Sequence, residues 1–173
     1  MRTVDLSDPE LNAFSGEHLL YELQLLLFTG QQLGRGPIPV MRSVLVESFV
    51  IHLRNLIDFF YTPRTKEDDV IAADFCPGWK ESISSTLKSA KERANKELSH
   101  ITLGRKDGFD PSKPWDVGAL YQEVHEVATR FAGKASAAKL SAEVPKWLGM
   151  FRANTIAVLE GMPTTNTTSS VIG

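Results

Sequence analysis

The clearest capacity for acid–base chemistry in this chain lies in an arginine and a histidine seven positions apart, Arg93 and His100. On a helix, this spacing puts both on one edge, about 10 Å apart along the axis. The histidine could act as general acid or base at a ribose hydroxyl, and the arginine could stabilise the charge of a phosphorane. The pair is therefore compatible with RNA cleavage that needs no metal. The alternative is that the pair has no catalytic role. The arginine would then be solvated, and the protonated histidine would interact favourably with the dipole at the C-terminal end of the helix.

A second polar group occupies one face of an apolar helix, between residues 52 and 58. It predicts either a phosphate-binding site that works with the other histidine or a structural network. In the network, Arg54 would pair with Asp58 four residues on, or with Glu97 of a later helix. The candidate catalytic residues are thus His100, Arg93 and Arg54, and the supporting ones are His52, Asn55, Asp58, Asn95, Lys96 and Glu97.

Several common chemistries are excluded by missing motifs. The chain has no P-loop, no glycine-rich dinucleotide turn, no GxSxG elbow and no HExxH. The acidic connector of Asp68, Asp69 and Asp74 lacks the spacing of a metal site, so we expect neither metal nor cofactor. The net charge of −2 means that any contact with nucleic acid must use a local patch, of which the stretch 88–106 is the most basic.

The elements that must position these residues are all predicted to be helices. Apolar periodicity and turn residues predict helices over about 17–32, 39–61, 79–103, 114–139 and 145–160, with a short one within 67–75. We therefore expect an all-α fold, an up-and-down bundle of four to five helices. Residues 1–162 would form one domain, and 163–173 a Thr/Ser-rich disordered tail.

We expect the protein to be cytoplasmic. The apolar stretch 19–28 follows acidic residues and carries Glu22, so it is neither a signal sequence nor a membrane span. A single cysteine, Cys76, rules out an intrachain disulfide and fits a reducing compartment. We expect no membrane partner.

The Arg93-to-His100 motif, beside the polar face of residues 52–58, resembles the HEPN superfamily. Its members are small α-helical proteins, often dimeric, and many are metal-independent ribonucleases of toxin–antitoxin and phage-defence systems; others bind nucleotides or are inactive. The residue after the motif arginine is usually polar there and is Ala94 here, which leaves open a pairing of Asn95 with His100 and Arg54 as the cation. The strings 52–60, 69–75 and 95–102 also resemble a bacterial helical family of unassigned function.

The resemblance implies a possible ribonuclease or RNA-binding toxin with RNA and an antitoxin-like protein as partners. It also implies a homodimer whose cleft contains the His100 edge of each helix, because one arginine and one histidine are too few to position and cleave a phosphate. Arg54 and Asp58 should then face the helix that carries Glu97 and His100. The alternative is a non-catalytic helical-bundle module that binds a protein partner or a small ligand. Aromatic residues near helix ends could be covered by a second subunit or close the monomer's own core: Trp79, Trp115, Trp147 and Phe109.

Overall fold

The computed structural model describes residues 6–63, 66, 68–97, 115–152 and 155, with only the backbone of Glu97 included. All regular elements in these ranges are helices, so the prediction of an all-α fold is confirmed. The proposed tail 163–173 lies outside the described residues.

The first helical run begins earlier than the sequence analysis expected. It comprises α1 (Asp8–Phe14), a π-helical turn η1 (Ser15–Leu19) and α2 (Leu20–Gly34). The predicted start at residue 17 was wrong because Ser7 and Glu10 form a capping box ahead of it. The π turn lies where the chain meets a distant loop: the Ser15 hydroxyl accepts a hydrogen bond from the Ser141 amide at 2.9 Å.

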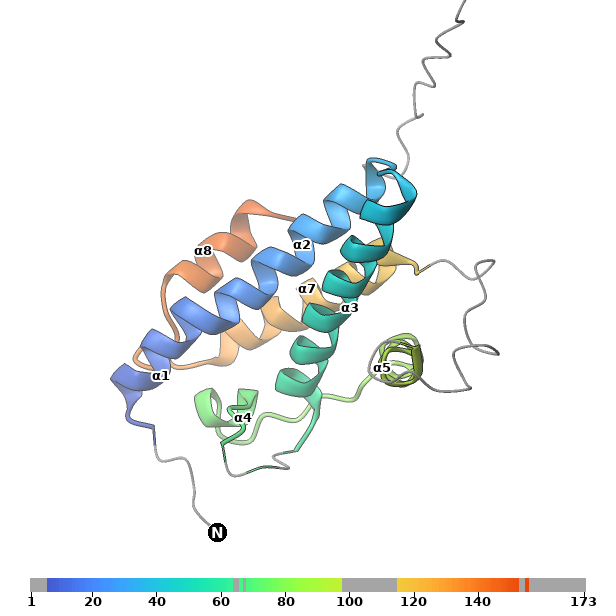
Figure 1. The fold of residues 1–173 in the computed structure, drawn as a ribbon. Coiled ribbons are helices and arrows are strands. Elements are labelled where there is room, and N and C mark those ends of the chain that lie inside the picture. Colours follow the sequence, from blue (N-terminus) through green and yellow to red (C-terminus); the bar gives the residue numbers. More distant parts are fainter. Residues whose placement is uncertain (1–5, 64–65, 67, 98–114, 153–154, 156–173) are drawn as a thin grey trace, which may run out of the picture.

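The second helix has the predicted bounds, α3 (Pro39–Tyr61), with proline in its first turn. It packs along α2 as an antiparallel hairpin, the most extensive contact between any two described elements. In Figure 1 these two helices lie in front, joined at the top, and α7 passes behind both.

The middle of the chain is less helical than predicted. It contains α4 (Ala72–Phe75) and α5 (Ser85–Glu97), and residues 79–84 are not helical. Ser84 explains the late start of α5, since its hydroxyl accepts from the Leu87 amide at 3.0 Å. Trp79 instead donates from Nε1 to the carbonyl of Phe60 at 2.8 Å. The predicted extension of this helix beyond 97 lies outside the described residues.

The last two helices are also shorter than predicted: α7 (Val117–Lys134) and α8 (Glu143–Met150). Asp116 caps α7, where its carboxylate accepts from the Ala119 amide at 3.0 Å. The chain is extended at Ala135 and again at Phe151, so neither helix continues as expected, and most of the predicted segment 151–160 lies outside the described residues. The His125 imidazole closes the end of α8 by donating to the Phe151 carbonyl at 2.5 Å.

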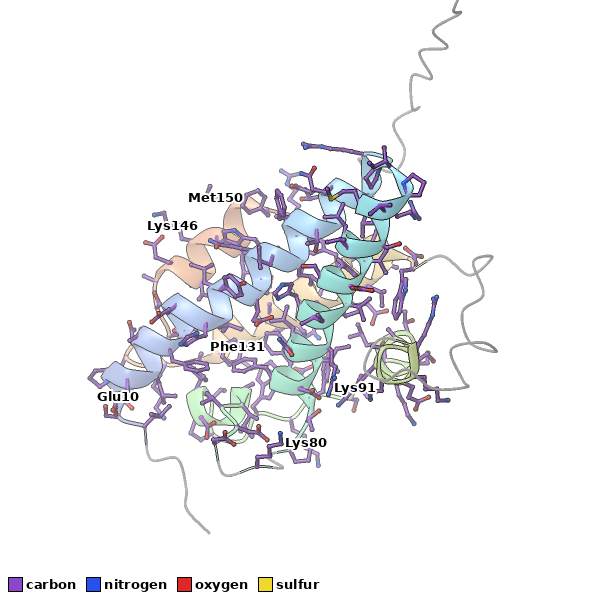
Figure 2. The ribbon with its side chains drawn as sticks, in the orientation of Figure 1. Glu10, Lys80, Lys91, Phe131, Lys146 and Met150 are labelled. Carbon is purple, nitrogen blue, oxygen red and sulfur yellow. The ribbon has the colours of Figure 1, made fainter. Side chains whose placement is uncertain are left out.

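The core extends over all the long described helices, and its aromatic cluster lies where α3, α4 and α7 meet. Phe131 of α7 is fully buried (Figure 2), and its ring meets four other rings edge to face. These are Phe59, Phe60, Phe75 and Trp79. This cluster fixes the lower half of α3, which carries the polar residues predicted to form a site. No helix among the described residues is long and apolar enough to cross a membrane.

Candidate functional site

Glu22 of α2 joins the two helices of the hairpin through polar side chains of α3. Its carboxylate accepts from His52 Nδ1 at 2.7 Å and from Asn55 Nδ2 at 3.2 Å to each oxygen. Because a carboxylate only accepts, Nδ1 of His52 carries the hydrogen and the orientation of the imidazole is fixed. His52 is 8% exposed, yet its Nε2 is not among the buried atoms that lack a partner. No hydrogen bond of Nε2 is formed with the described part of the chain.

Asp58, six residues further along α3, faces α5 instead. Its carboxylate accepts from Lys91 Nζ at 2.5 Å and from the Thr62 hydroxyl at 3.0 Å. Arg54 lies 3.9 Å from the same carboxylate and is 44% exposed. Lys91 extends from α5 toward the lower half of α3 (Figure 2). Asp58 therefore contacts the next long helix through Lys91, which was not among the predicted site residues. The predicted proximity to Glu97 and His100 lies outside the described residues.

A cleft of about 270 Å³ opens between these two polar clusters. On one side it is lined by the end of α1, η1 and the start of α2, and on the other by the lower half of α3 and the connector residues 62–63 and 69–71. Three carboxylates line it, those of Glu22, Asp58 and Asp69, together with the rings of Phe14, His18 and Phe59. Among the described residues, no lysine or arginine lines the cleft. The carboxylates of the wall are therefore suited to a cation, although that of Asp58 is already paired with Lys91 and Arg54.

Arg93 is on the other flank of α5 from Lys91. Residues two apart on a helix point about 200° away from each other, so Lys91 faces α3 while Arg93 faces the start of α7. There its guanidinium lies 4.2 Å from the centroid of the Trp115 ring. The structure thus brings Arg54 next to Asp58, and it gives His52 and Asn55 a shared partner in Glu22. Arg93 lies over Trp115.

The remaining candidate residues lie at the end of α5 or beyond it. Asn95 and Lys96 are exposed on this helix. The side chain of Glu97 and all of His100 lie outside the described residues, so the pairing of Arg54 with Glu97 and the role of His100 stay predictions.

Two carboxylates of the acidic connector accept hydrogen bonds from nearby backbone amides. Asp69 accepts from the amide of Lys66 at 2.8 Å and Asp74 from that of Ile71 at 2.9 Å, while Asp68 is exposed. Within the described ranges, no three or more histidine, cysteine or acidic side chains are grouped as metal ligands would be.

The sequence analysis missed the role of Glu22, which is the polar centre of the hairpin. A signal for it was present, since Glu22 is the only acid in the apolar stretch 19–28. A carboxylate inside an apolar helix needs a donor from a neighbouring element. His18 and Phe14, which also line the cleft, had no comparable signal. A comparison of the chain with protein families, with curated proteins and with solved structures finds no match.

Proposed function

We propose that this chain is a non-catalytic helical-bundle module that binds a small organic cation in the cleft between α2 and α3. The observation that carries the proposal is the combination of three carboxylates with aromatic walls, from Phe14 and Phe59, in one cleft. Carboxylates accept hydrogen bonds from amines and guanidinium groups, and aromatic faces attract cations.

The hydrogen bonds of Glu22 leave room for a ligand at its carboxylate. An ionised carboxylate has about four acceptor sites. Glu22 receives one hydrogen bond from His52 and a shared one from Asn55, which leaves acceptor sites for a further donor. The cleft volume of about 270 Å³ is just below the range for ligand pockets, about 300–1,000 Å³, so the ligand should be small.

The test is calorimetric titration with agmatine, which carries an amine and a guanidinium group, beside inorganic phosphate as the anionic comparison. We expect agmatine to bind and phosphate not to bind. Glu22→Gln and Asp69→Asn should each weaken agmatine binding about tenfold or more, since each removes one charge from the wall. Glu143→Gln, on the exposed surface of α8, is the matched control. Preferential binding of phosphate, or unchanged binding by both cleft variants, would refute the proposal.

A second candidate is a HEPN-like, metal-independent ribonuclease or RNA-binding toxin that acts in the cytoplasm with an antitoxin-like partner. Two observations favour it. A carboxylate orients the His52 imidazole through Nδ1, as a carboxylate does for a general base. Half-exposed Arg54 lies on the same helix, and Lys88 and Lys96 are exposed on α5, which leads directly to His100.

Expression in a bacterial host separates the two candidates. A toxin should slow growth, and His100→Ala and Arg54→Ala should each restore it. His18→Ala is the matched control, because this histidine is exposed and lies outside the predicted catalytic set. The purified protein should also cleave RNA in the presence of EDTA. Normal growth together with intact RNA would leave the binding module as the better proposal.

A further inference from the structure

The outward face of the α2–α3 hairpin carries nearly all the exposed large apolar side chains of the described residues. Six of them lie on these two helices: Tyr21, Phe28, Val40, Met41, Val44 and Ile51. Ile38, in the turn between the helices, is also exposed, and Met150 on α8 is the one such residue elsewhere in the described ranges. We call the six side chains together the hairpin face.

The hairpin face is continuous across both helices. Tyr21 and Phe28 are seven residues apart and so share one side of α2, and Val40, Val44 and Ile51 share one side of α3. The ring of Tyr21 lies 5.7 Å from that of His52, next to Ile51, which sets the two stripes side by side. Because α7 covers the opposite side of the hairpin, this face is turned away from the core (Figure 1).

The area of this face is that of an interface. An aromatic side chain carries about 150–250 Å² of surface and an aliphatic one less, so these six, about half exposed or more, present on the order of 500 Å². The largest apolar patch of a typical monomer is about 300–600 Å², and a standard protein–protein interface covers about 800 Å² per partner. The hairpin face therefore lies at the upper end of the range for a monomer and would supply more than half of one side of a standard interface.

The charge along the hairpin identifies the occupant as a second copy of the chain. Between Glu22 and Glu47 there is no acidic residue, and the tip carries Arg35 and Arg42. The opposite end carries the acidic cleft. Two hairpins packed antiparallel about a two-fold axis place each basic tip near the acidic end of the other, whereas a parallel pair would place like charges together.

The register of this antiparallel pair follows from two exposed charges of α3. Glu47 lies four residues before Ile51, and Arg54 lies three residues after it. An axis that passes between the levels of Val50 and Ile51 therefore puts Glu47 of each copy level with Arg54 of the other, with the two Ile51 side chains close to the axis. We propose that the hairpin faces of two copies pack antiparallel in this register and form a four-helix bundle around the axis. This surface differs from the α5 edge that the sequence analysis assigned to a dimer.

Light scattering at micromolar concentration tests the dimer itself. We expect a mass twice the 19.2 kDa of one chain. Val44→Glu should give a monomer with an unchanged circular dichroism spectrum, because Val44 is exposed in the single chain. Met150→Glu is the matched control, since Met150 is even more exposed but lies on α8, and it should remain dimeric.

Two further measurements test the register. Glu47→Arg and Arg54→Glu should each weaken the dimer about tenfold, and the double exchange should restore it. In a Cys76→Ser background, Ile51→Cys should be joined between chains by a short bismaleimide crosslinker, and Met150→Cys should not.

Other occupants predict other results, and each would overturn the proposal. A monomer that binds anionic vesicles and loses this binding with Val44→Glu would make the face a lipid contact. A monomer that binds no vesicles would leave the face without the proposed partner. A dimer that survives Val44→Glu and is not crosslinked at position 51 would place the contact elsewhere.

Discussion

Replacing Glu22 by glutamine tests whether the hairpin is held together by a charged hydrogen-bonding centre. Glutamine keeps the shape of the side chain but has only one accepting oxygen, while His52 and Asn55 both donate. One donor must then face the new amide group. Hydrogen bonds to a charged group contribute about 1.5–3 kcal/mol and neutral ones about 0.5–1.5 kcal/mol. Because the Glu22 side chain is 24% exposed and water compensates part of the loss, we expect the free energy of unfolding to fall by about 1–2 kcal/mol.

Urea unfolding followed by circular dichroism measures this loss as a lower midpoint with an unchanged slope. A double-mutant cycle with His52→Phe, which keeps a ring but removes both nitrogens, assigns the energy to the contact. Glu17→Gln, an exposed carboxylate on η1, should change the stability by less than about 0.5 kcal/mol. A Glu22→Gln variant as stable as this control, with no coupling to His52, would show that the contact does not hold α2 to α3.

Three further substitutions test the core by the same unfolding measurement. Phe131→Ala should cost about 3–5 kcal/mol, because it empties the centre of the aromatic cluster; a loss below about 1 kcal/mol would contradict that packing. Trp79→Phe should cost about 1–2 kcal/mol, because it removes the hydrogen bond that the Trp79 indole donates to the Phe60 carbonyl. Tyr121→Phe should be neutral or stabilise by about 1 kcal/mol, because the buried Tyr121 hydroxyl has no hydrogen-bond partner among the described residues. Burial raises the pKa of Tyr121, so the unfolded chain ionises first and wild-type stability should fall as the pH rises above about 10, less steeply in this variant.

The bounds of the helices could be predicted wherever local signals decided them. The helix over 39–61 has proline in its first turn, a broad apolar arc and the stop at Thr62-Pro63, and the structure gives the same bounds. The start of α5 could not be found in this way, since the apolar spacing from Trp79 onward continues the helical pattern. What ends the pattern there is a tertiary contact, in which the Trp79 indole satisfies a carbonyl that the last turn of α3 leaves free.

The candidate site shows the same division between local and tertiary information. The sequence identifies the polar group at 52–58, but which neighbour each side chain meets depends on the helices that flank α3. His52 and Asn55 turn to α2 because Glu22 is there, and Asp58 turns to α5 because Lys91 is there. A helix turns about 100° per residue, so three residues are enough to move from one neighbour to the other. A helical wheel places all of these residues on one polar face and so makes them look like one site. In the bundle, that face is divided between α2 and α5, and the acidic cleft lies between the two polar clusters.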